Sequence, residues 1–182
     1  MAHKSNLQWY ADRLRLAYIM RKNRKTRDPK FYMFLDFDGV INVFFREGTP
    51  EYEEAISKEN FEFVSRQAVD RLNLLCEEFP LTIIISSSWR FAGLPYCQEY
   101  LHNAGLDDRF TPVDLTNTEV WKLREEEITD YLFAHPDFTG FIIYDDGNMP
   151  HLLEYLVHTD PCKGLDEKKY SASRKILSGF LK

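Results

Sequence analysis

The sequence lacks the features that would assign the chain to a membrane protein or to a secreted, disulfide-bonded class. No apolar run approaches the roughly 20 residues that a membrane-spanning helix needs. Charged residues from Asp12 onward interrupt the N-terminal region where a signal peptide would be apolar. The cysteines, Cys76, Cys97 and Cys162, are widely spaced and odd in number, so they suggest neither a zinc site nor a disulfide framework. We therefore expect a cytoplasmic protein in a reducing compartment.

Internal repeats and low-complexity segments are also absent, and the composition fits one globular domain. The chain has 182 residues, of which 44% are hydrophobic and 15% aromatic, enough for a full core. Its net charge of -6 is unevenly distributed, because residues 1–30 hold nine Lys and Arg against Asp12 and Asp28. We expect a basic N-terminal helix and linker over residues 1–30 and the main folded domain over residues 31–182.

The basic segment 21–30, RKNRKTRDPK, has two interpretations. It would suit an electrostatic arm for nucleic acid or another polyanion. It would equally suit a solvated helix end and linker, and we favour this second interpretation because no aromatic residues lie among the charges.

Hydrophobic periodicity predicts strands that alternate with helices. A helix is expected over residues 7–20, with Ser5 as its N-cap and with Leu7, Tyr10, Leu14 and Tyr18 on its apolar face. Further helices are expected over residues 66–79, 94–104, 119–134, 149–156 and 167–181, and residues 43–64 are expected to be irregular. Apolar runs of strand length occur at 31–37, 81–86 and 141–145, with shorter extended pieces at 109–113 and 156–159. This order predicts an α/β fold with a mainly parallel sheet.

Polar side chains cluster where the three clearest strands end. Asp36 and Asp38 end the first strand, the serines 86–88 followed by Trp89 and Arg90 end the second, and Asp145 with Asp146 end the third. In parallel sheets the ligand site lies outside the carboxyl ends of the strands. We therefore expect these side chains to meet in one site.

Four carboxylates at one sheet edge would repel each other unless a cation neutralises them. Oxygen-only ligands favour a hard ion, most simply Mg²⁺, which also neutralises and polarises a bound phosphate. In the spacing Asp36-x-Asp38, one carboxylate can attack phosphorus while the other protonates the leaving oxygen. The serines would supply donors to phosphate oxygens, and Lys122 or Arg124 would supply the missing cation.

These motifs carry a resemblance to a known family. The stretch FLDFDGVIN, residues 34–42, resembles the first motif of the haloacid dehalogenase-like (HAD) superfamily, IIISSSWR resembles its second, and YDD, residues 144–146, resembles its acidic fourth. The serine-x-tryptophan form of the second motif and the GLD at Gly164 are similar to compact HAD domains associated with RNA-repair proteins. The resemblance implies a Rossmann-like three-layer sandwich with a minimal cap or none.

The resemblance also implies roles for individual residues. Asp36 would be the nucleophile and a metal ligand, and Asp38 the general acid/base with its backbone carbonyl facing the metal. Asp145 and Asp146 would complete the metal site. Ser87 would bind phosphate, with Ser86 as its close competitor. The basic third motif stays open between Lys122 and Arg124. An acid at position 38 favours phosphoryl chemistry over dehalogenation, because a halide leaves without a proton.

Other residues have competing interpretations. Trp89 is expected to be a packing residue more than a base-stacking one, and Arg90 either binds substrate phosphate or pairs with a carboxylate. The glutamates 125–127 are expected to form a solvated helix face, and His151 a surface or core residue without a ligand role.

The expected substrate is a phosphorylated nucleic-acid end, since residues 43–64 allow only a small flap and leave the site open. The alternatives are a small-molecule phosphatase for nucleotides or sugar phosphates, and an inert HAD scaffold for protein interaction. The sequence leaves the oligomeric state open.

Overall fold

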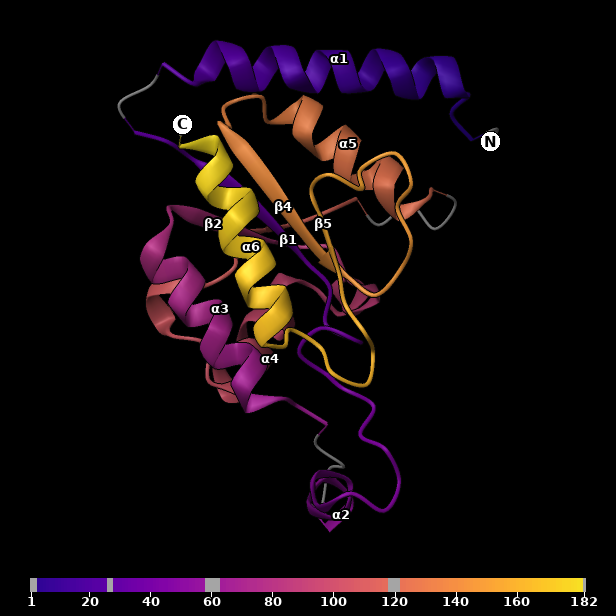
Figure 1. The fold of residues 1–182 in the computed structure, drawn as a ribbon, viewed down its shortest axis with the longest axis vertical. Helices are drawn as coiled ribbons and strands as arrows, with labels where there is room; N and C mark the ends of the chain where they lie inside the picture. Colours follow the sequence, from indigo (N-terminus) through magenta and orange to yellow (C-terminus); the bar gives the residue numbers. More distant parts are fainter. Residues whose placement is uncertain (1–2, 26–27, 58–62, 118–121, 182) are drawn as a thin grey trace.

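The computed structural model describes residues 3–25, 28–57, 63–117 and 122–181, and it has an α/β architecture (Figure 1). Five parallel strands form the central sheet in the order β3-β2-β1-β4-β5. Their bounds are β1 Phe31–Leu35, β2 Leu81–Ile85, β3 Asp114–Leu115, β4 Gly140–Asp145 and β5 Leu156–His158. The prediction of a Rossmann-like fold with a parallel sheet is confirmed.

The order of the strands fixes where a ligand site can form. The chain adds β2 and then β3 on one side of β1, and later adds β4 and β5 on the other side. The order therefore reverses between β1 and β4, and such a switch point opens a crevice at the carboxyl ends of the two strands. Leu35 is paired with Tyr144 at that end, so Asp36 and Asp145 follow side by side.

Helices cover both faces of the sheet. Alternate residues of β1 separate the two cores: Phe31, Met33 and Leu35 join one cluster, and Tyr32 with Phe34 joins the other. The first cluster packs under α3 (Arg66–Glu78), α4 (Leu94–Ala104) and α6 (Glu167–Phe180). The second packs under α1 (Asn6–Asn23) and α5 (Arg124–Ala134). The result is the three-layer arrangement that the resemblance implies.

The helix α1 begins after Ser5 as predicted, but it packs through a different face. Ser5 and Gln8 form a reciprocal capping box at its start. The buried residues are Trp9, Leu16 and Ile19, whereas Leu7, Tyr10, Leu14 and Tyr18 are more than half exposed. Apolar residues occur almost all round this helix, so periodicity alone did not identify the packed face. The division of the chain at residue 30 stays a prediction, although Leu16 and Ile19 share a core with the sheet.

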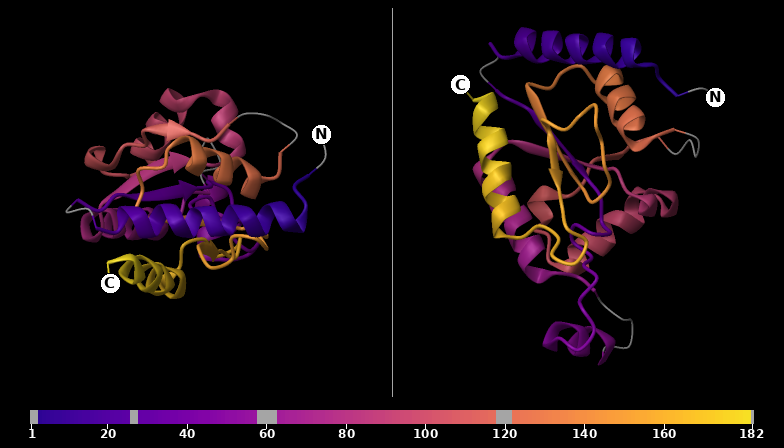
Figure 2. Two further views of the ribbon diagram at one scale, coloured as in Figure 1. Left: turned by 90° about the horizontal axis from the view of Figure 1, so that it is seen from above. Right: turned by 45° about the vertical axis from the view of Figure 1, so that its right-hand side comes forward.

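Several local predictions were wrong. Residues 43–64 include a helix, α2 (Pro50–Ser57), which projects away from the sheet (Figure 2, right). Residues 149–156 form turns and the start of β5 in place of a helix, and residues 108–110 form a 3₁₀ turn in place of an extended piece. The helix predicted from residue 119 begins at Arg124, while residues 118–121 lie outside the described residues. Within the described ranges, no helix is both long and apolar enough to cross a bilayer.

The packing of α1 predicts that substitution of two leucines on this helix changes the free energy of unfolding by very different amounts. Leu16 is 1% exposed and Leu14 is 56% exposed. Leu16→Ala should lower the free energy of unfolding by about 2–5 kcal/mol, because it leaves a cavity between α1 and the sheet. Leu14→Ala should change it by less than about 0.5 kcal/mol. Urea denaturation of both variants checks this, and equal effects would contradict the assigned face.

Candidate active site

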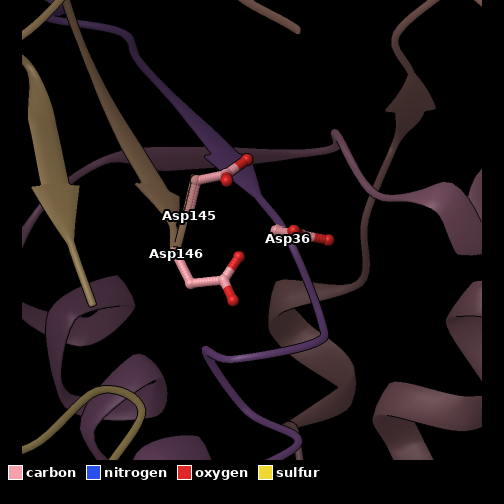
Figure 3. Close-up of side chains that lie close together, drawn as sticks. All are labelled: Asp36, Asp145 and Asp146. Atoms are coloured by element: carbon pink, nitrogen blue, oxygen red, sulfur yellow. The ribbon is translucent and has the colours of Figure 1, made fainter. Parts of the chain in front are cut away.

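Three aspartates form a cluster at the switch point of the sheet. Asp36 follows β1, Asp145 ends β4 and Asp146 comes directly after it (Figure 3). One carboxylate oxygen from each residue lies within 4.8 Å of the other two, and the described residues place no His or Cys in this group. Hard divalent cations prefer such an oxygen-only donor set, so these three residues fit a magnesium-type ion.

A glycine makes the close approach of Asp146 possible. Gly39 adopts φ +71°, a left-handed conformation that turns the chain back after Asp38. A Cβ atom at this position would lie 2.5 Å from Oδ2 of Asp146. The glycine of the first motif therefore leaves room for a carboxylate of the fourth.

The electrostatics of Asp36 reflect this crowding. Burial raises its pKa from 3.8 to about 6, and the neighbouring charge of Asp145 adds to the rise. Arg124 and the hydroxyl of Ser87 oppose the shift. Burial also raises the pKa of Asp145. The negative charge of these carboxylates is therefore only partly neutralised by the neighbouring Arg124.

The structure separates the two candidates for the third-motif cation. Nη1 of Arg124 lies 3.9 Å from Oδ1 of Asp36 and 4.0 Å from Oδ2 of Asp145. This buried nitrogen has no hydrogen-bond partner among the described residues. Lys122 instead directs its amine to Asp130 at 3.0 Å. Arg124 is therefore the cation that lies in the site and retains donor capacity.

The two serine candidates both lie at the carboxyl end of β2 but differ in their contacts. The hydroxyl of Ser87 hydrogen-bonds Asp36 and accepts a bond from the backbone N–H of Trp89 at 3.3 Å. The hydroxyl of Ser86 is buried and has no partner among the described residues. Both hydroxyls fit a phosphate-binding role: that of Ser87 lies beside Asp36, and that of Ser86 has unused hydrogen-bonding capacity.

Asp38 is separate from the three-aspartate cluster and is held by neutral donors. Its Oδ2 accepts a 2.9 Å hydrogen bond from Nε1 of Trp89, and its Oδ1 accepts a 3.1 Å bond from Nδ2 of Asn42. The hydroxyl of Tyr100 in turn donates to Oδ1 of Asn42 at 2.5 Å. The carboxylate of Asp38 therefore has a fixed orientation, and the predicted metal role rests on its backbone carbonyl.

Trp89, Asn42 and Tyr100 are site residues that the sequence analysis did not assign. Trp89 does pack as expected, with its ring 5.6 Å from Phe37 and 4.5 Å from Tyr100. Its bond to Asp38 adds a positioning role to the packing role. In the sequence, the one signal of such a role was the position of Asn42, which follows Asp38 by four residues within the first motif.

The prediction for the glutamates 125–127 was wrong, because all three side chains are buried. Glu127 binds the guanidinium of Arg90 at 2.7 Å, and Arg90 also donates to the backbone carbonyls of Ser87 and Asn117. Arg90 is thus engaged by a carboxylate, the second of its two interpretations, and its contacts do not support the predicted phosphate-binding role. The charge of Arg90 compensates that of Glu127, and its hydrogen bonds to the carbonyls of Ser87 and Asn117 hold the loop that carries Ser87.

The other two glutamates tie the start of α5 to neighbouring segments. Glu125 contacts the ring of His151 at 2.7 Å, and this ring stacks on Trp9 of α1 with a 4.4 Å separation. Glu126 accepts hydrogen bonds from the backbone N–H groups of Lys4 and Leu123. These contacts fix the helix start that carries Arg124.

The raised pKa of Asp36 predicts that, without metal, the free energy of unfolding depends on pH. Since the folded-state pKa exceeds the unfolded value, the folded protein binds more protons between about pH 4 and pH 6. Stability from this group is therefore lost as the pH rises through that window. In EDTA, Asp36→Asn should raise the free energy of unfolding at pH 7.5 by about 1–3 kcal/mol and have a smaller effect at pH 4. Denaturant titrations at both pH values measure this.

The control for that experiment is Asp70→Asn, because Asp70 lies exposed on α3. It should leave stability unchanged at both pH values. A loss of stability in Asp36→Asn that is equal at both pH values would contradict the crowding of charges.

The buried ion pair predicts a second contrast. Glu127→Gln would leave the guanidinium of Arg90 buried without a countercharge, and should destabilise the protein by about 3–5 kcal/mol. Glu154→Gln removes an exposed partner of Arg13, 3.1 Å away, and should cost less than about 1 kcal/mol. Thermal or urea denaturation compares them, and a mild effect of Glu127→Gln would show that the pair is not required.

Comparison with known proteins agrees with this geometry. The model of the family described as the HAD domain in Swiss Army Knife RNA repair proteins matches residues 32–170. No curated protein matches the chain, and no solved structure does. The match spans all three motif-bearing strand ends and more than half of the chain. The protein therefore belongs to the HAD domain family of Swiss Army Knife RNA repair proteins.

Proposed function

We propose that this HAD-type hydrolase is a Mg²⁺-dependent phosphatase that acts through an aspartyl-phosphate. One observation carries the proposal: the guanidinium nitrogen of Arg124 lies between Asp36 and Asp145 and, within the described structure, lacks an acceptor. A phosphoryl group in contact with Asp36 would supply that acceptor. Its negative charge would then face a fixed cation, which is how phosphoryl transfer is stabilised.

The three-aspartate cluster is the proposed metal site. Asp36, Asp145 and Asp146 would hold Mg²⁺, together with the backbone carbonyl of Asp38. When bound, the ion would neutralise the phosphate and relieve the repulsion among the carboxylates. The donor set fits the ion because it consists of oxygens alone.

The reaction follows from two carboxylates of different surroundings. A carboxylate oxygen of Asp36 attacks phosphorus, and the bond between phosphorus and the leaving oxygen breaks. Protonated Asp38 gives its proton to that oxygen, so that an alcohol departs. A water molecule then attacks the phosphoryl group, the carboxylate of Asp38 accepts its proton, and inorganic phosphate leaves with Asp36 regenerated. Trp89 and Asn42 keep Asp38 oriented through both steps.

The proposed substrate is a phosphorylated nucleic-acid end, which an open site would admit. The basic segment 21–30 contributes only at a distance, because it leads into the amino end of β1. Asn23 donates to the carbonyls of Pro136 and Phe138, and Lys30 bonds Thr139, which precedes β4. A five-residue strand spans about 16 Å, so only an extended polymer would reach both the segment and Asp36.

The substrate proposal thus separates long from short substrates. An oligonucleotide long enough to reach the basic segment should bind with a steep salt dependence, unlike a mononucleotide. Good turnover of mononucleotides or sugar phosphates without such dependence would favour a small-molecule phosphatase.

The free cysteines agree with the proposed cytoplasmic location, since they suit a reducing compartment.

Turnover of an aryl phosphate with Mg²⁺ tests the assigned roles. Arg124→Ala should lower kcat/KM by about 100-fold or more, because it removes the cation beside the transferred group. Lys122→Ala is the matched control and should stay within a few-fold of the wild type. Asp36→Asn should abolish turnover. Equal losses in the two cation variants, or an active Asp36→Asn, would contradict the proposal, and inactivity of the wild type with every divalent metal would favour a scaffold.

A further inference from the structure

A cavity of about 470 Å³ lies beside Asp38, on the side where its carboxylate is held. This volume falls within the range of pockets that bind small organic groups. Five aromatic rings contribute to the lining: Phe44, Phe63, Trp89, Tyr96 and Tyr100. Asp38, the proposed acid/base, therefore lines this cavity. The lining is mainly aromatic, in contrast to the three-aspartate cluster.

The rings come from two separate parts of the chain. Trp89 belongs to the 3₁₀ turn after β2, and Tyr96 and Tyr100 belong to α4. Phe44 and Phe63 lie on the two segments that lead to and from α2. The backbone of the second group is anchored, because Val43 N–H donates to the carbonyl of Phe63 and Phe44 N–H to that of Pro161.

Two of these rings are exposed to an unusual degree for large aromatic side chains. Phe44 is 59% exposed and Tyr96 is 50% exposed. Exposed apolar surface that rims a concave site is typical of a ligand-binding groove. Polar residues are also at hand, since Asn42, Arg66 and Asn103 line the same cavity.

We infer that this cavity is a nucleobase subsite, which holds the base of the nucleotide that carries the scissile phosphate. The inference rests on the proposed function, because Asp38 can protonate only a leaving group that lies on its own side. A base fits the lining better than a bare sugar does. Planar heterocycles stack on aromatic rings, and side-chain amides bind their edges. The five rings meet the first need, and Asn103 offers a side-chain amide for the second.

The subsite also explains the form of the second motif. Trp89 donates its indole N–H to Asp38 while its ring lines the cavity. One side chain therefore contacts both the acid/base and the proposed base. A substrate with a base would be aligned relative to the proton donor by the same residue.

The test compares substrates with and without a base. A nucleoside monophosphate and a short oligonucleotide with a terminal phosphate should be turned over with lower KM than ribose phosphate and the same oligonucleotide with an abasic end. Phe44→Ala and Tyr96→Ala should each raise KM for the base-bearing substrates by about tenfold, with kcat changed less. Neither change should affect ribose phosphate. Tyr10→Ala is the control, because Tyr10 is an equally exposed ring on α1.

A binding arm keeps the inference testable if turnover fails. The Asp36→Asn variant should bind a nucleoside monophosphate more tightly than ribose phosphate, and Tyr96→Ala in that background should remove the difference. Equal affinity for the two ligands, or no effect of either ring variant, would overturn the subsite. Absence of turnover alone would overturn the proposed function and leave the binding result to decide the subsite. Comparison of the mononucleotide with the oligonucleotide identifies which source of base the site prefers.

Discussion

The repulsion among Asp36, Asp145 and Asp146 is the constraint on which the rest of the site depends. The reversal of strand order between β1 and β4 brings two strand ends together, and an acidic residue stands at each. Burial of such a cluster costs free energy unless cations compensate it. Arg124 compensates part of this charge, at 3.9 Å from Asp36 and 4.0 Å from Asp145. The remaining negative charge is the reason to propose a bound metal ion.

The surroundings of the cluster serve to hold the groups that act on phosphate. Arg124 stands at the start of α5, and the buried glutamates that follow it bind Arg90, His151 and the N-terminal segment. Asp38 stands apart, oriented by Trp89 and Asn42. The two aspartates of the first motif therefore have different environments, one crowded with charge and one bounded by neutral donors. A cation bound at the cluster would keep Asp36 ionised for attack, whereas Asp38 lies outside the cluster, where its carboxyl group can exchange a proton with the substrate.

The sequence predicted β1, β2, β4 and β5, the parallel sheet and the family, because these depend on local patterns and short motifs. It missed β3 (Asp114–Leu115), a two-residue strand that lies just after the extended piece predicted at 109–113. Asp36, Asp145 and Asp146 could be grouped from the rule that parallel strands end at one edge. The choice of Arg124 over Lys122, and the burial of the glutamates 125–127, depend on side-chain direction and on partners distant in sequence. Likewise, the packed face of α1 was decided by contacts distant in sequence, since apolar residues occur on several sides of that helix. Leu16 and Ile19 share a core with α5 and the sheet, and Trp9 stacks on His151.

The most direct test of the central claim is to look for the covalent intermediate. The protein, with Mg²⁺ and a phosphorylated substrate, is quenched in acid during turnover, digested and examined by mass spectrometry. The account predicts one phosphoryl group on the peptide that contains Asp36, and specifically on that side chain. Full release of phosphate with no modified peptide at any quench time, or a phosphoryl group on a different residue, would contradict it.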